Sequence, residues 1–345
     1  VFKPGEMAVE ELPSRGLSRR WHAAFCFLTG VACFMALNQL LNWQLFVGLV
    51  LLENRHLYLL AGCLISLVFL AYPASARAPM DRVPWYDALL FVATVGVSGY
   101  FLWNGERGIA EGWEYSAPAL VIALCGLYWL LILEATRRTG GPVLFLVVLF
   151  LSLYPMFADQ MPGPIKGFPR PFTDTLAFHI VSAESSFGIP MRAFAELVIG
   201  FIVFGVALNY TGGGKFFNDV AFALVGGIRG GPAQVGILSS GLQGSISGSV
   251  ISNVITSGVV TIPAMKRCGF KPTYAAAVEA TSSTGAVLMP PVMGSTAFVM
   301  ASFLGISYGT IALAATIPGL LFYFGLAMQV DAYAAREGLR GLPRN

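Results

Sequence analysis

One stretch of the sequence combines many oxygen-bearing side chains with a complete lack of charge. Residues 239–258 read SSGLQGSISGSVISNVITSG and contain seven serines and four glycines, together with Gln243, Asn253 and Thr256. Oxygen atoms are the ligands that small hard cations prefer. This segment is too polar to face lipid, and it lacks the charges of a cytoplasmic loop. We therefore expect it inside protein at membrane depth, where it lines a polar cavity.

The rest of the chain is apolar enough to need a lipid environment. Of its 345 residues, 56% are hydrophobic and 11% are charged, and mean hydropathy is +0.71, whereas a soluble domain carries about 25% charged residues. Only helices and closed barrels satisfy their backbone groups in lipid, and the alternation of barrel strands is absent. The sequence therefore predicts an all-α, multi-pass integral membrane protein. A spanning helix needs about 20 mostly apolar residues, and the segments that qualify are 21–41, 56–72, 85–103, 117–135, 141–157, 192–210 and 306–330.

Positive charges between these segments indicate the orientation of the chain, because Lys and Arg gather on the cytoplasmic side of a membrane. The N-terminal residues and the second and fourth connectors are basic, whereas connector 104–116 carries Glu106, Glu111 and Glu114. This pattern predicts a cytoplasmic N-terminus, and no removable signal peptide is recognised. The residues expected in the cytoplasm are Lys3, Arg15, Arg19, Arg20, Arg77, Arg82, Arg137 and Arg138.

Charge also decides whether the serine–glycine segment crosses the membrane. A crossing over 232–265 would divide the 21 Lys and Arg residues almost evenly between the two sides. A re-entrant hairpin keeps most of them in the cytoplasm, and this is what the positive-inside rule favours. We expect the hairpin to occupy about 232–265 and to turn near Ser247, Gly248 and Ser249.

The following segment, 272–302, must then cross once, and it is longer than one straight helix needs to be. Pro290 and Pro291 each remove a backbone donor and free carbonyl groups one turn earlier. Gly285 can leave helical geometry at low cost. The sequence therefore predicts a broken helix over about 272–302 with an unwound middle within 281–294.

A hairpin tip beside a broken helix is an arrangement with which secondary transporters bind ions and solutes. The alternative is that small residues here only let helices approach closely. The residues predicted to bind substrate or ion are Ser247, Gly248, Ser249, Asn253, Ser283, Thr284 and Gly285. Within this set, the predicted Na⁺ site consists of Ser247, Ser249, Thr284 and Gly285.

Ionisable side chains near membrane depth are few. Glu279 lies one turn before the predicted break, and we expect either a proton carrier or a structural partner. Glu134 and Asp331 lie at helix ends beside arginines and are expected to be interfacial anchors. The five cysteines show no metal-ligand spacing. No cofactor is expected beyond a coupling ion, Na⁺ or H⁺.

Two connecting segments are expected to lie along a surface. Residues 158–191 begin rich in proline and glycine, and 173–187 could form a surface helix capped by Thr173 or Asp174. This connector is either a simple loop or part of a docking surface for an external partner. Residues 216–228 alternate apolar and polar positions and are expected along the inner membrane interface.

The run RGGPAQVGILSSGLQGSISGSVISNVITSGVVTIPAMKRCGFKPTYAAAVEATSSTGAVLMPPVMGSTAFVMA, residues 229–301, resembles the large permease subunit of TRAP transporters. Its long and specific parts are SISGSVISNV, TIPAMKR and STGAVLMPPVMG. The resemblance extends more loosely over about 141–340, and residues 1–140 resemble the four-helix small membrane subunit. The chain is most similar to the fused form that accompanies TAXI-type binding proteins.

This resemblance implies a function and a set of partners. A periplasmic binding protein of TAXI type would deliver a small organic solute, often a carboxylate. The permease would import it by an elevator-like movement driven by a Na⁺ or proton gradient, which is symport. The family has two inverted repeats, and 141–345 would be the first of them, so a C-terminal repeat is expected to be missing.

Two departures from the family pattern accompany the resemblance. Ile251 and Ser252 stand where Val and Ala are commoner, and Gly285–Ala286 replaces a common Gly–Gly pair. The shorter length keeps a second hypothesis open, namely a truncated scaffold subunit without transport activity. A membrane-embedded enzyme is a third, and no Ser–His or paired-carboxylate arrangement supports it.

Overall fold

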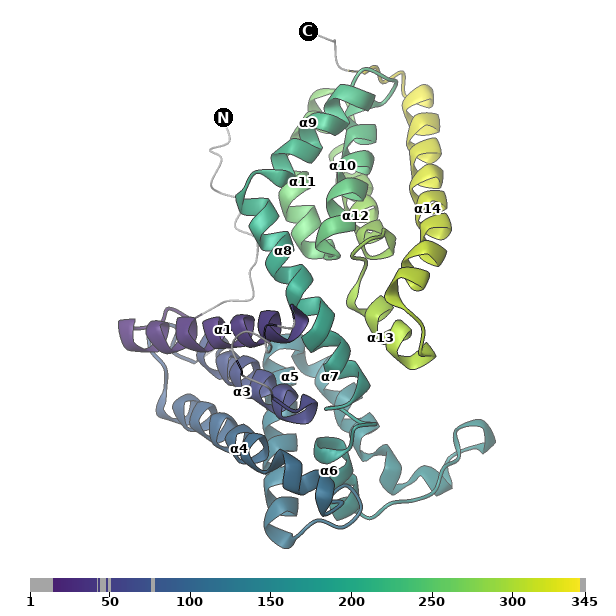
Figure 1. Ribbon diagram of the computed structural model, residues 1–345. Helices are drawn as coiled ribbons and strands as arrows, with labels where there is room; N and C mark the ends of the chain where they lie inside the picture. The colour runs from purple at the N-terminus through teal and green to yellow at the C-terminus, as the bar shows by residue number, and fades with distance from the viewer. Residues whose placement is uncertain (1–14, 42, 44–47, 49–50, 76–77, 342–345) are drawn as a thin grey trace. The chain divides into compact units, whose positions relative to one another are not determined.

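The computed structural model of the chain describes residues 15–41, 43, 48, 51–75 and 78–341. The predicted cytoplasmic residues Lys3 and Arg77 lie outside the described residues. Every regular element within the described ranges is a helix, which confirms the predicted all-α class. The chain divides into two compact units, Val1–Glu196 and Leu197–Asn345, and each is described by itself (Figure 1).

Five described helices are long and apolar enough to cross a membrane. Four belong to the first unit and confirm the predicted segments there: α1 (Arg19–Leu40), α3 (Glu53–Ala71), α4 (Trp85–Ala110) and α5 (Ala119–Leu153). The predicted segments 117–135 and 141–157 form one run, α5, which is interrupted at Gly141 by a φ of 77°. Pro142 follows directly, and a proline cannot supply the helical hydrogen bond at this point.

Aromatic packing forms the centre of the first unit. Tyr58 of α3 stacks on Phe101 of α4, with 5.3 Å between ring centroids, and its hydroxyl donates to the Ile180 carbonyl at 2.8 Å. Tyr128 of α5 also stacks on Phe101, with 6.2 Å between ring centroids, and its hydroxyl accepts a hydrogen bond from Ser98. Side chains from three apolar helices thus bury their few polar atoms against one another.

A buried ion cluster joins the ends of these helices. Asp87, at the start of α4, is fully buried and lies 2.7 Å from the Nη2 atom of Arg15 and 2.8 Å from the Nη1 atom of Arg138. Arg138 also pairs with Glu134 at 2.8 Å, and Arg137 pairs with the same carboxylate at 2.7 Å. The anchoring role predicted for Glu134 agrees with these pairs.

The predicted surface helix over 173–187 is shorter and differently capped. Helix α6 (Phe172–Val181) follows Pro171, whose side chain cannot cap it. Because the helix begins at Phe172, Thr173 and Asp174 lie inside its first turn, so the prediction that one of them caps it is wrong. One face of α6 is buried against α5, including Thr175 and Ile180.

The predicted helix 192–210 runs across the boundary between the units. It consists of α7 (Ile189–Ala193), the π-helical turn η4 (Phe194–Val198) and α8 (Ile199–Tyr210). The amphipathic segment that follows is α9 (Gly213–Val225), which exposes Phe216 and Leu224 and buries Asn218. Three short 3-10 turns precede α6 along the chain: η1 (Tyr154–Met156), η2 (Ala158–Gln160) and η3 (Gly163–Ile165).

The second unit contains the hairpin and the interrupted helix that the sequence predicts. Helices α10 (Gly231–Ser247) and α11 (Val250–Arg267) pack on each other and are joined at Gly248 and Ser249. The next helix is α12 (Pro272–Thr284), which continues as the 3-10 turn η5 (Gly285–Leu288), breaks, and resumes as α13 (Ser295–Leu304).

Helix α14 (Tyr308–Arg336) is the fifth spanning candidate and lies along α10 and η5 (Figure 1). Its C-terminal half helps to enclose the apolar core at one end of the hairpin. That core consists of Ala233, Ile237, Met265, Phe270, Ala275, Val278, Val330 and Ala334. The core fixes α10, α11, α12 and α14 together and leaves the hairpin turn at their opposite end.

Candidate functional site

The hairpin turn depends on a glycine. Gly248 has a φ of 57°, a left-handed conformation that costs an L-residue free energy, and its N–H donates to the Gly244 carbonyl at 2.9 Å. A Cβ atom at Gly248 would lie 1.9 Å from the Met293 carbonyl oxygen. The turn therefore presses directly against the backbone of the interrupted helix.

Ser247 and Ser249 flank this glycine and carry the hydroxyl groups of the turn. Ser249 is the N-cap of α11, and its Oγ accepts from the Ser252 N–H at 3.3 Å. Ser247 ends α10, and its Oγ accepts from the Ser249 N–H at 3.4 Å. Both residues are half-buried. Their hydroxyl oxygens retain lone pairs that a small cation could use.

The helix break is held by backbone hydrogen bonds to the hairpin and within itself. Pro290 and Pro291 are joined by a cis peptide bond. The carbonyl of Val287 has no helical donor because residue 291 is a proline, and it accepts from the Gly294 N–H at 2.9 Å. The Val292 N–H donates to the Ser245 carbonyl of the hairpin at 2.9 Å. The Tyr308 hydroxyl lies 2.6 Å from the carbonyl oxygens of Pro291 and Val292.

The unwound part begins later than the sequence suggested. Gly285 has helical angles, φ −61° and ψ −18°, so the expectation that it leaves helical geometry is wrong. Its lack of a side chain serves another purpose, because a Cβ atom there would lie 2.5 Å from the Phe322 ring and 2.8 Å from the Tyr323 ring. The interruption proper covers residues 289–294.

The remaining predicted site residues do not gather at the turn. Thr284 is exposed and its hydroxyl donates to the Ala280 carbonyl at 2.7 Å. Asn253 is fully buried and donates from Nδ2 to the Ser240 carbonyl at 2.9 Å, which ties α11 to α10. Ser283 is also fully buried and donates to Glu279 at 3.3 Å.

The hairpin therefore meets the interrupted helix at two levels. Gly244 packs against Ala286, where an added Cβ atom would lie 2.4 Å from the Ala286 Cβ, and Gly248 packs against Met293. The turn that carries Ser247 and Ser249 therefore packs on residues 292–293 of the helix break, and not on Thr284 and Gly285. Asn253, Ser283 and Glu279 form a separate buried cluster between α10, α11 and α12.

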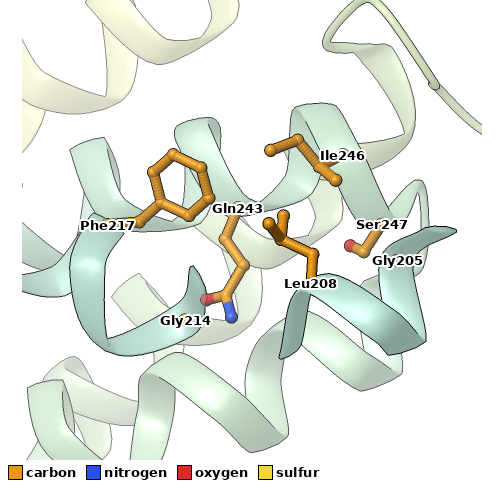
Figure 2. A pocket seen from close by; sticks show the side chains of 7 residues that line it. All are labelled: Gly205, Leu208, Gly214, Phe217, Gln243, Ile246 and Ser247. Carbon is orange, nitrogen blue, oxygen red and sulfur yellow. The ribbon is translucent and has the colours of Figure 1, made fainter. Parts of the chain in front are cut away.

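A small cavity adjoins the turn on the side of α8 and α9. Its volume is about 10 Å³, room for about one water molecule. Figure 2 shows the Gln243 amide extending toward Gly214, and Ser247 beside Gly205. Gln243 is 4% exposed, and neither of its amide atoms has a hydrogen-bond partner among the described residues. Gln243 belongs to the polar segment 239–258, but it is not among the residues predicted from sequence to bind substrate or ion.

A helical hairpin whose turn packs on an interrupted helix, within a bundle of apolar helices, is the architecture of a membrane permease. Residues 127–345, more than half of the chain, match the family described as "Tripartite ATP-independent periplasmic transporter, DctM component". The chain belongs to this family.

Two relatives that the chain resembles are named TRAP transporter large permease proteins. The chain is 31% identical over 149 residues to the C4-dicarboxylate TRAP transporter large permease protein DctM of Pseudomonas aeruginosa. The aligned residues are 43% of this chain and 34% of that protein. It is 28% identical over 203 residues to the ectoine/5-hydroxyectoine TRAP transporter large permease protein UehC of Ruegeria pomeroyi, covering 58% and 46%. The chain thus spans less than half the length of these relatives.

Proposed function

We propose that this chain is a permease component of a binding-protein-dependent importer that an ion gradient drives. It would lie in a bacterial inner membrane with its N-terminus in the cytoplasm and import a small organic solute, with carboxylates as the expected class. The observation that carries the proposal is the contact between Gly248 of the hairpin turn and Met293 of the helix break. Irregular backbone at membrane depth is tolerated where it lines a site or cavity.

The proposed coupling-ion site is the hairpin turn. Ser247 and Ser249 would contribute hydroxyl oxygens, and the backbone at 292–293 would face them. Thr284 and Gly285 belong to the Na⁺ site predicted from sequence. They lie near the contact between Gly244 and Ala286, so they would need to move toward the turn at Gly248 to bind the same ion. Within this proposal Na⁺ is a transported substrate, and the glycines at the turn let backbone oxygens come close to it.

The finer assignments from sequence belong to this proposal as well. Residues 1–140 would act as a small-subunit-like scaffold, and 141–345 as the first repeat of a transport domain that moves as an elevator. A TAXI-type periplasmic protein would be the solute-binding partner. The names of the relatives, C4-dicarboxylate and ectoine permeases, are compatible with a small organic solute.

Uptake by proteoliposomes tests this function directly. The chain, reconstituted with a solute-binding protein, is expected to accumulate a labelled solute when a Na⁺ or proton gradient is imposed without ATP. The alternative of a non-transporting scaffold predicts no uptake and no binding of radiolabelled Na⁺ by the chain. A membrane-embedded enzyme would instead convert the solute, which product analysis in the same vesicles would reveal.

Replacing Ser249 by Ala is expected to weaken the binding of radiolabelled Na⁺ at least several-fold while membrane insertion is kept, because one proposed ligand oxygen is lost. The same change removes a helix cap, which costs about 1 kcal/mol of stability. Ser307→Ala is the matched control, since Ser307 caps α14 by the same contact, Oγ to the Thr310 N–H at 3.3 Å. Equal Na⁺ binding by the two variants would remove Ser249 from the site.

A further inference from the structure

A carboxyl group lies buried at the centre of the second unit, away from the hairpin turn. Glu279 of α12 is 1% exposed. Its Oε1 atom contacts the hydroxyl of Ser257 and lies 3.3 Å from that of Ser283, and its Oε2 atom lies 2.5 Å from that of Thr261. All of these described partners are hydroxyl groups, so this carboxyl differs from those of Asp87 and Glu134, which face arginines.

The elements packed around Glu279 present no positive charge to it. Helix α10 approaches with Gly236 and α11 with Gly258, and α10 contains no ionisable residue. The basic residues of α11, Lys266 and Arg267, lie in its last turn and are exposed. From α14 the titratable neighbour is Tyr323, whose hydroxyl donates to the Ser282 carbonyl at 2.8 Å. An ionised Glu279 would be a buried charge without a counter-ion among the described residues, which is costly.

The hydroxyl groups around Glu279 have too few protons for all of their close contacts. The Ser257 Oγ atom lies 2.7 Å from the Asn253 carbonyl and also contacts Oε1. The Thr261 Oγ1 atom lies 3.0 Å from the Ser257 carbonyl and 2.5 Å from Oε2. Each hydroxyl has one proton. If these protons satisfy the helix carbonyls, oxygen lone pairs face both carboxyl oxygens, and a proton on the carboxyl relieves this conflict at one of the two contacts.

The contact between Glu279 and Thr261 has the length of a hydrogen bond. The Oε2 atom lies 2.5 Å from the Thr261 Oγ1 atom. This separation is within the range of O–H···O hydrogen bonds, so one of the two oxygens donates a proton to the other.

We propose that Glu279 is a proton-binding site, which carries a neutral carboxylic acid in this structure and shares its proton with hydroxyls of the hairpin helix α11. Release of this proton requires water or a cation to reach the carboxylate. Since α10, α11 and α12 enclose it, release is tied to a separation of these helices. The link to transport rests on the proposed function, within which Glu279 would bind a proton at a place distinct from the turn serines.

Infrared spectroscopy of the whole chain in lipid nanodiscs at neutral pH tests this site. The carbonyl stretching band of a protonated carboxylic acid is expected, and Glu279→Gln is expected to abolish it. Gln has the shape of the neutral acid and can both donate and accept, so the fold should be kept. Glu134→Gln is the control and should leave the band, because Glu134 is paired with Arg137 and Arg138.

A band at neutral pH that Glu279→Gln does not remove, or no such band, would overturn the proposal. If Glu279→Gln fails to fold, Thr261→Val takes its place, since it removes one hydroxyl contact and leaves the carboxyl. The band is then expected to shift in frequency, and an unmoved band would contradict the assignment. The measurement needs no solute and no partner. Failed uptake with this band present would therefore reject the permease proposal and leave the proton site standing.

Discussion

Gly248→Ala is expected to destabilise the second unit more than any other single methyl group added to it. The left-handed backbone at this position costs an L-residue roughly 1–2 kcal/mol. The added Cβ atom would also lie 1.9 Å from the Met293 carbonyl oxygen, and overpacking of this kind costs roughly a further 1–3 kcal/mol. Thermal unfolding in detergent, followed by circular dichroism, measures the sum.

Gly305→Ala is the matched control for this change. Gly305 has a φ of 64°, close to that of Gly248, and its added Cβ atom would meet nothing within 4 Å. The control therefore includes the conformational cost without the clash. We expect a clearly larger loss of thermal stability for Gly248→Ala than for Gly305→Ala. Equal losses would show that the hairpin turn does not press on the helix break.

Asp87→Asn is expected to cost about 3–5 kcal/mol of stability in the first unit, as is typical when one partner of a buried ion pair is removed. Asp87 faces both Arg15 and Arg138 at fully or almost fully buried positions. The asparagine side chain keeps the size of the group but removes the negative charge between two guanidinium groups. Denaturant titration of the detergent-solubilised chain measures the loss.

An exposed ion pair of the same unit supplies the comparison. Glu106 pairs with Arg55 at 3.0 Å, and its side chain is 65% exposed. Glu106→Gln is expected to change stability by less than about 1 kcal/mol, because solvent screens such pairs. A similar small effect for Asp87→Asn would mean that water reaches the cluster and that the three side chains do not hold the helix ends together.

The hairpin and the interruption were predictable because each has a local cause in the sequence. Twenty residues without charge but with seven serines cannot face lipid, and Gly248 marks the turn. Pro290 and Pro291 stand next to each other, and this favours an interruption of the helix because neither supplies a backbone donor. Local rules of this kind place the break within 281–294, and the structure has it in the second part of this segment, at 289–294.

Gly285 shows where local rules fail. A glycine before two prolines suggests a flexible joint, but this glycine is helical and makes room for the rings of Phe322 and Tyr323. Those rings come from a helix almost forty residues later. Asp87 is a similar case, because its partners lie 72 residues before it and some fifty residues after it, and no pattern near Asp87 indicates them.

The partners of Glu279 were within reach of the sequence. Asn253, Ser257 and Thr261 follow one another at intervals of four and therefore share one face of α11. This row of polar side chains on one face of α11 indicates an inward-facing polar group opposite it. The sequence does not indicate that α12 brings the Glu279 carboxyl to these residues. Nor does it indicate that Thr284 is exposed and that Gly285 packs on Phe322 and Tyr323.

Accessibility of the two ends of the hairpin to a membrane-impermeant maleimide shows whether the chain turns back within the membrane between α10 and α11. Ile228 precedes α10 and Lys266 lies in the last turn of α11, and both are exposed. The variants are Ile228→Cys and Lys266→Cys. Each is introduced singly into a chain whose five native cysteines are replaced by alanine or serine. A hairpin that enters and leaves on the cytoplasmic side predicts labelling of both only from that side. Labelling of the two positions from opposite faces would contradict the hairpin, and the proposed ion site at its turn with it.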